Sequence, residues 1–134
     1  MFILQSMIIV TAAILIQSNK ILITRRARGK HLAGYWEFPG GKLEAGETEK
    51  ECLVREIKEE LDICIDVNAF FMENTHGYRD KTVNLKAYFC NFISGNITLK
   101  DHDKMAWVNK TELDNYTFSP ADIPFVERLK TWKF

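Results

Sequence analysis

One segment, Gly40 to Ile63, constrains the fold of this chain more than any other stretch: GGKLEAGETEKECLVREIKEELDI. Its paired glycines predict a tight turn with a closely approached backbone, and Thr48 to Leu61 has the apolar periodicity of a helix. One side of this helix should meet a sheet through apolar side chains. These are Leu53, Ile57 and Leu61, with Val54 beside them.

Three glutamates of this helix, Glu56, Glu59 and Glu60, are spaced so that they share one face. Like charges at this spacing destabilise an isolated helix, so helix stability does not explain them. Mg²⁺ and Mn²⁺ prefer carboxylate oxygen, and Mg²⁺ commonly bridges to the phosphates of a substrate. The spacing therefore indicates a site for a hard divalent cation.

The same segment resembles the Nudix box of the Nudix hydrolase family, GX5EX7REUXEEXGU, in which U is an aliphatic residue. The residues that fit it in register are Gly41, Glu47, Arg55, Glu56, Ile57, Glu59, Glu60 and Ile63. Asp62 stands where the box has its late glycine. Helices often end there in the left-handed conformation, which Asp tolerates better than most residues, so we expect the metal site to be kept.

The resemblance extends over essentially the whole chain and implies the Nudix fold. This is an α/β/α sandwich of the α+β class, with a mixed sheet between helices, and we expect residues 1–134 to form a single domain. Within the box, the resemblance gives Arg55 the role of orienting the helix glutamates through a salt bridge to Glu47. The alternative for Arg55 is an exposed ion pair that contributes less than about 1 kcal/mol.

The resemblance also implies the ligands of the metal site. The run EFPGGK is similar to the MutT branch of the family, in which the glycine before the box offers its carbonyl to a metal. Asp101 lies six residues before Trp107, where MutT-like proteins carry a further acidic ligand. Glu56 is the first candidate for the base that accepts a proton from the attacking water. The implied ligands of Mg²⁺, with Mn²⁺ as the alternative ion, are Gly40, Glu56, Glu59, Glu60 and Asp101.

A basic cluster precedes the glycine turn and is a candidate phosphate clamp, because Arg side chains suit phosphate oxygens. Its members are Arg25, Arg26, Arg28, Lys30 and His31. Arg26 and His31 stand where MutT-type enzymes place phosphate-contacting side chains, whereas the alternative for the cluster is a solvated loop. For Trp36 and Phe38 we expect core packing, with stacking on a nucleobase as the alternative. His102 suits Mg²⁺ less well than a carboxylate does, so we expect a solvated or hydrogen-bonded loop position for it.

Asp122 has two interpretations. It can cap the final helix, because Asp is a preferred N-cap residue. It can also read the base, because MutT resembles this run and uses an asparagine at the position for that purpose. An ionised Asp only accepts hydrogen bonds, which suits the N4 amino group of cytosine or the N7 hydrogen of 8-oxoguanine and disfavours ordinary guanine.

The rest of the chain reads as strands and turns. We expect strands at Met7 to Ile16, with Met1–Ser6 as a short extension, and at Ile21 to Thr24, joined by a hairpin turn at Gln17 to Lys20. A second set comprises a strand at Ile63 to Met72, a polar turn at Asn74 to Asp80 and a strand at Lys81 to Phe92. Alternation in this last strand predicts one inward face. A short helical turn at Thr111 to Leu113 and a final helix with Phe125, Val126 and Leu129 as its apolar stripe complete the pattern.

Composition narrows the class of protein. A formal net charge of zero argues against a dedicated binder of nucleic-acid polymers. Three cysteines without CxxC spacing favour a reducing, cytoplasmic setting over a disulfide framework. The apolar N-terminal stretch is too short to span a bilayer and lacks a basic leader region. We therefore expect no membrane partner, and a monomer or a homodimer.

These features predict a Mg²⁺-dependent nucleoside triphosphate pyrophosphohydrolase. The resemblance implies MutT-like cleavage of 8-oxo-dGTP or a related (d)NTP to the monophosphate and pyrophosphate, with (d)CTP pyrophosphohydrolase as the first alternative. Hydrolysis of ADP-ribose or of a dinucleoside polyphosphate is the next. A non-catalytic, nucleotide-sensing Nudix domain is the last, since such domains typically lose glutamates that this box retains.

Overall fold

The computed structural model describes residues 7–134, so the extension expected at Met1–Ser6 lies outside the described residues. Its strands are β1 (Met7–Gln17), β2 (Lys20–Arg26), β3 (Trp36–Glu37), β4 (Gly40–Lys42), β5 (Ile63–Gly77), β6 (Thr82–Gly95) and β7 (His102–Val108). Its helices are α1 (Glu49–Leu61), α2 (Ile123–Thr131) and the 3₁₀ helices η1 (Lys110–Asn115) and η2 (Pro120–Asp122).

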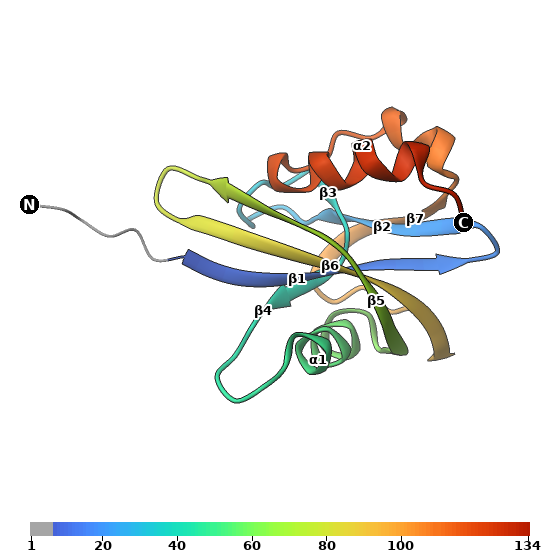
Figure 1. Cartoon of the computed structure of the whole chain (residues 1–134), viewed down its shortest axis with the longest axis horizontal. Helices are drawn as coiled ribbons and strands as arrows, with labels where there is room; N and C mark the ends of the chain where they lie inside the picture. The colour runs from blue at the N-terminus through green and yellow to red at the C-terminus, as the bar shows by residue number, and fades with distance from the viewer. Residues whose placement is uncertain (1–6) are drawn as a thin grey trace, which may run out of the picture.

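The described strands form one mixed sheet in the order β3-β2-β1-β6-β5, with β4 paired to β1 and β7 paired to β2. Strands β1 and β6 run parallel, and the other neighbours are antiparallel. Helices α1 and α2 lie on opposite faces of this sheet (Figure 1). The predicted α/β/α sandwich with a mixed sheet is therefore confirmed.

The first strand is apolar on both sides because both of its faces are covered. Ala12 and Ile14 belong to the core on the α2 side, whereas Ala13 and Leu15 belong to the core on the α1 side. The hairpin that follows turns at Ser18 and Asn19, both with positive φ, as the tight connections between antiparallel strands require.

Helix α1 begins and ends as its sequence predicts. Thr48 forms a capping box with Glu51, and the Thr48 hydroxyl accepts a hydrogen bond from the Glu51 N–H at 3.1 Å. Asp62 closes the helix in the left-handed conformation, with φ 58° and ψ 35°. The stripe of Leu53, Ile57 and Leu61 is fully buried, but the prediction for Val54 is wrong, since it is 41% exposed. Val54 lies about 100° round the helix from Leu53, at the margin of the buried face, which extends instead to Cys52 on the other side of Leu53.

Strand β5 is longer than expected, and the predicted polar turn at Asn74 to Asp80 is wrong for its first half. The strand stays paired with β6 as far as Gly77, opposite Thr82, and only residues 78–81 turn. Polar residues are kept in this part of the sheet by side-chain hydrogen bonds, such as the one that Asn84 Nδ2 donates to Thr75 Oγ1 at 2.9 Å. Tertiary pairing overrides the local turn preference here.

Strand β6 has two packed faces rather than the single inward face predicted. Val83, Leu85 and Ala87 join the core beneath α2, while Cys90 is buried beneath α1. The alternation of apolar and polar residues correctly predicted the face that packs beneath α2. It did not predict the second packed face, which exists because β6 lies between β1 and β5 in the interior of the sheet. The short helical turn near Thr111 and the buried stripe of α2, which is Phe125, Val126 and Leu129, are confirmed.

No helix within residues 7–134 is both long and apolar enough to cross a membrane.

Candidate active site

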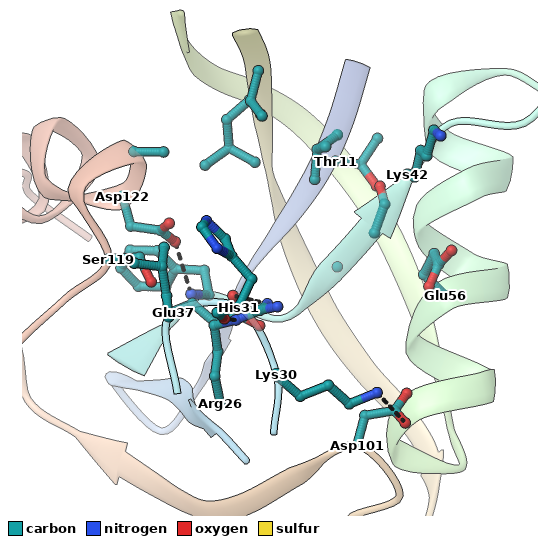
Figure 2. A pocket seen from close by; sticks show the side chains of 18 of the residues that line it. Thr11, Arg26, Lys30, His31, Glu37, Lys42, Glu56, Asp101, Ser119 and Asp122 are labelled. Carbon is teal, nitrogen blue, oxygen red and sulfur yellow. Dashed lines mark hydrogen bonds and ion pairs between the residues drawn. The ribbon is translucent and has the colours of Figure 1, made fainter. Parts of the chain in front are cut away.

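A pocket of about 320 Å³ opens between helix α1 and strand β4 on one side and the 3₁₀ helix η2 on the other (Figure 2). It collects most of the site residues predicted from sequence. Those that line it are Arg26, His31, Phe38, Gly40, Glu56, Glu60, Asp101 and Asp122. Three predicted residues do not line it, namely Glu47, Arg55 and Glu59.

The Arg55 guanidinium ties the loop before α1 to the glutamates of the helix. Its Nε and Nη2 donate to the two oxygens of Glu47 at 3.0 and 2.7 Å, so the expected ion pair is present. Its Nη1 donates to Glu56 Oε1 at 2.9 Å and to Glu59 Oε2 at 3.2 Å. The hydrogen bonds from Arg55 lower the pKa of Glu47 to about 2. Arg55 is thus placed to orient Glu56 from outside the pocket, whereas Glu59 is 60% exposed there.

Glu56 lies directly against the backbone of Gly41. A Cβ added at Gly41 would come within 2.1 Å of Glu56 Cδ, and one added at Gly40 would come within 1.9 Å of the Thr11 carbonyl oxygen. Both glycines are therefore required by close approach rather than by an unusual backbone conformation. Burial raises the pKa of the Glu56 carboxyl, although Arg55 opposes the shift.

Glu60 is the most perturbed carboxyl at the helix end of the pocket. Its Oε2 is buried and has no hydrogen-bond partner among the described residues. Burial first, and then the negative charges of Glu37, Glu56 and Asp101, raise its pKa to about 9. A divalent cation bound here would offset the repulsion between these carboxylates and would give the buried oxygen a partner.

Asp101, from the segment between β6 and β7, lies at the same end of the pocket (Figure 2). Its side chain is half exposed, and Lys30 Nζ lies 4.0 Å from its Oδ1 (Figure 2). Within residues 7–134, no three His, Cys, Asp or Glu side chains are gathered closely enough to hold a metal ion as they stand. The donor set still fits a hard cation, because carboxylate oxygens are the preferred ligands of such ions and one of them is buried without a partner.

Arg26 and His31, the predicted phosphate contacts, lie at the middle of the pocket. Arg26 Nη1 donates to Glu37 Oε1 at 3.0 Å, and Arg26 Nε donates to the His31 carbonyl. His102 Nε2 lies 2.8 Å from Glu37 Oε2, so the hydrogen-bonded alternative expected for His102 is correct, although it lies buried at the start of β7. The Glu37 carboxylate therefore links Arg26 and His102 through one hydrogen bond to each.

Asp122 lies at the far end of the pocket. It occupies the N-cap position of helix α2, but its side chain does not cap the helix, so the capping interpretation is correct for the position and wrong for the carboxylate. Its carboxylate makes no cap hydrogen bond and instead accepts from the Phe38 N–H at 3.0 Å. Burial first, and then the charge of Glu37, raise the pKa of Asp122 well above its ordinary value. A protonated carboxyl can donate as well as accept, so the premise that Asp122 only accepts holds for its ionised form alone.

Phe38 packs as expected and also borders the pocket. Its ring is almost completely buried and stacks on Phe118 with centroids 5.3 Å apart. Tyr78, from the β5–β6 turn, places its ring edge-on to that of His31, with centroids 5.3 Å apart. Sequence reasoning missed Tyr78, as it missed Ser119, because neither belongs to a motif and both reach the pocket only through the fold.

The basic cluster divides into two groups. Arg25 makes a paired hydrogen bond with Asp103 on the neighbouring strand β7, at 2.8 and 2.9 Å, and does not line the pocket. Lys30 does line it, as do Lys42 and Lys81, which were not singled out from sequence. Arg25 is therefore neither a pocket residue nor part of a solvated loop, but an ion-paired residue of strand β2. Lys30 joins the cationic groups near the acidic end.

Comparisons with known proteins agree with this geometry. A family model described as "NUDIX domain" matches residues 11–128. The chain is similar to the CTP pyrophosphohydrolase of Escherichia coli (strain K12), with 35% identity over 121 residues that cover 90% of each chain. It is 33% identical to the 8-oxo-dGTP diphosphatase of the same organism, over 85% of this chain and 88% of that protein. The solution structure named DNA mismatch repair protein MutT (family Nudix hydrolase), from methicillin-resistant Staphylococcus aureus 252, superposes with a TM-score of 0.77 at 38% identity, covering 96% of this chain and 98% of that one.

Proposed function

Because the chain belongs to the NUDIX family, we propose that it is a Mg²⁺-dependent nucleoside triphosphate pyrophosphohydrolase. Its substrate in this proposal is 8-oxo-dGTP or a related (d)NTP, cleaved to the monophosphate and pyrophosphate. The observation that carries the proposal is a single pocket with two chemically different ends. Glu56 and Asp101 lie at one end, and Asp122 lies at the other (Figure 2). Glu60 also lines the pocket and lies close enough to Glu56 and Asp101 for their charges to raise its pKa.

The acidic end supplies the ligands for the cation. Glu56, Glu60 and Asp101, with the Gly40 carbonyl, would hold it. Glu59, which lies outside the pocket and is paired with Arg55, would have to turn towards them to join as a ligand. When bound, Mg²⁺ neutralises charge on the polyphosphate and lowers the pKa of the attacking water.

The residues around the acidic end hold the phosphates and move the proton. Glu56 is the proposed base, because it lines the pocket against the Gly41 backbone and Arg55 fixes its orientation. Arg26 and His31 would bind phosphate oxygens from the middle of the pocket, and Lys30 would bind them beside Asp101. Each of these groups positions the triphosphate without reading its base.

The second candidate function is hydrolysis of CTP or dCTP. The observation in its favour is the position of the Asp122 carboxyl at the far end of the pocket, since its ionised form can accept a hydrogen bond from the cytosine amino group as readily as from 8-oxoguanine. The similarity to a CTP pyrophosphohydrolase supports it equally. Because the box keeps all of its glutamates, a non-catalytic nucleotide sensor is the weaker proposal.

A pyrophosphate-release assay with Mg²⁺ tests the proposal directly. We expect hydrolysis of 8-oxo-dGTP or CTP to exceed that of dGTP, and little hydrolysis of ADP-ribose or a dinucleoside polyphosphate. A chain that hydrolyses ADP-ribose best would belong to another branch of the family. A chain that binds nucleotides and hydrolyses none would be a sensor.

The proposed setting is the cytoplasm. Cys52, Cys64 and Cys90 are all free thiols, which supports a reducing compartment.

A further inference from the structure

Three buried side-chain oxygen or nitrogen atoms within the described residues have no hydrogen-bond partner. They are Glu60 Oε2, His102 Nδ1 and Ser119 Oγ. All three belong to residues that line the same pocket. A buried polar group without a partner is costly, so these atoms mark where a ligand can supply what the protein does not.

Two of the three atoms have an explanation in the site already described. Glu60 Oε2 lies among the carboxylates proposed to hold a cation. The His102 ring is already held in that site, because its Nε2 is hydrogen-bonded to Glu37, which also binds Arg26. The hydroxyl of Ser119 has no such explanation, since it does not cap η2.

Ser119 is held firmly beside Asp122. Its N–H donates to the Trp36 carbonyl at 2.9 Å, and its own carbonyl accepts from the Asp122 N–H at 2.9 Å. The Asp122 carboxyl is in turn held by the Phe38 N–H, so both side chains are anchored to the same stretch of backbone around strand β3. Figure 2 shows Ser119 and Asp122 next to each other, on the side of the pocket away from Glu56.

We propose that the Ser119 hydroxyl is a second hydrogen-bonding group for the nucleobase, acting together with the carboxyl of Asp122. This inference rests on the proposed function. It assigns a second group to the end of the pocket that contains Asp122, which we call the base-reading end. Ser119 lines the pocket, and its hydroxyl has three staggered positions about χ1.

The chemistry of this pair predicts which base edges it selects. The ionised carboxylate of Asp122 accepts a hydrogen bond, while the Ser119 hydroxyl supplies the donor that the carboxylate lacks. The pair therefore matches an edge on which a donor and an acceptor are adjacent. In 8-oxoguanine the N7 hydrogen lies between two carbonyl oxygens, and in cytosine the N4 amino group adjoins N3. Ordinary guanine presents two acceptors, N7 and O6, on its major-groove edge and fits less well.

The test compares Ser119→Ala with Ser94→Ala, an exposed serine on β6 that does not line the pocket. We measure kcat/KM for 8-oxo-dGTP, CTP and dGTP, and the Kd of 8-oxo-dGMP, CMP and pyrophosphate by calorimetry. For Ser119→Ala we expect roughly a tenfold loss in kcat/KM for the preferred triphosphate and in affinity for its monophosphate, because the bound base loses one hydrogen bond in a buried site. We expect a smaller loss for dGTP, unchanged binding of pyrophosphate, and no loss of melting temperature.

Other outcomes overturn the inference in distinguishable ways. An unchanged ratio of preferred nucleotide to dGTP, as for Ser94→Ala, means that Ser119 does not contact the base. A lower melting temperature with equal losses for all nucleotides assigns it a structural role. If the parent protein hydrolyses no triphosphate and binds no monophosphate, the proposed function fails together with the inference.

Discussion

Glu60 and Asp122 are both carboxyl groups buried in the pocket, and burial raises the pKa of each, but they differ in their partners. Glu60 Oε2 has no hydrogen-bond donor and faces the charges of other carboxylates. Asp122 accepts from the Phe38 N–H and is also stabilised by the nearby charge of Arg26. The first arrangement needs a cation, whereas the second is prepared for a hydrogen bond. Burial alone therefore does not reveal the role of an acidic residue, but its neighbours do.

The largest effect should come from removing charge at the acidic end. We expect Glu56→Gln and Glu60→Gln each to lower kcat by orders of magnitude, because both remove a proposed cation ligand while leaving the helix intact. Steady-state kinetics with Mg²⁺, together with circular dichroism, measure the two effects. Glu127→Gln, an exposed glutamate of α2, is the control and should behave as the parent. Near-normal turnover in either pocket variant would show that the substituted carboxylate does not bind a cation needed for catalysis.

A smaller loss should follow when the same end is disturbed without a change of charge. Gly41→Ala would place a methyl group 2.1 Å from Glu56 Cδ, and the flexible Glu56 side chain is the group that must move. Displacing a reacting group by about 1 Å can cost roughly 100-fold in rate, which is the loss of kcat that we expect. Thermal unfolding should change little. Unaltered kcat would mean that the position of Glu56 against Gly41 is unimportant.

Arg26→Ala tests the middle of the pocket, between the two ends. A lost charge-assisted hydrogen bond contributes about 1.5–3 kcal/mol, so affinity for the triphosphate should fall roughly 10- to 100-fold. The fall should be equal for every base, because phosphate contacts position the ligand without specifying it. Arg28→Ala, an exposed neighbour outside the pocket, is the matched control. Loss confined to one base would place Arg26 at the base-reading end instead.

Asp122→Ala should change base choice, with a loss of about 1–3 kcal/mol in transition-state binding for the preferred nucleotide. It should also lower the melting temperature, because the buried Phe38 N–H loses its acceptor. The charge of Asp122 adds a dependence on pH. Its pKa is raised, so at lower pH the protonated carboxyl can donate to guanine, and at higher pH the carboxylate repels the guanine acceptors. The ratio of kcat/KM for 8-oxo-dGTP and dGTP should thus increase with pH in the parent. It should be flat in the variant, and a ratio that is flat in both would leave Asp122 without a role in recognition.

The elements determined by local chemistry could be predicted from the sequence. The α1 caps at Thr48 and Asp62 and the ion pair of Arg55 with Glu47 follow from residues close together in the chain, and the structure contains all of them. The box spacing likewise brings Glu56 and Glu60 to one pocket. Motif and periodicity are sufficient where the interacting groups lie within a few turns of one another.

The elements determined by distant contacts could not be predicted. The Asp122 carboxylate binds an N–H group 84 residues away, so its N-cap preference was a misleading local signal for the side chain. Strand β5 continues past Asn74 because β6 pairs with it, although its residues favour a turn. Ser119 carries no motif, and its orphan hydroxyl is recognisable only once burial is known.

The central claim is that the Glu60 carboxylate is destabilised in the folded protein unless a cation binds it. Thermal unfolding of the parent and of Glu60→Gln across pH, with and without Mg²⁺, tests this most directly. The folded pKa of Glu60 is raised from 4.5 to about 9, so between these values the folded state binds more protons than the unfolded state. The stability that protonated Glu60 provides is therefore lost as pH rises through this window. Without metal, the melting temperature of the parent should fall more steeply from pH 6 to pH 9 than that of Glu60→Gln, and Mg²⁺ should restore it at pH 9 in the parent alone. Parallel pH profiles for the two proteins, with equal responses to Mg²⁺, would contradict the claim.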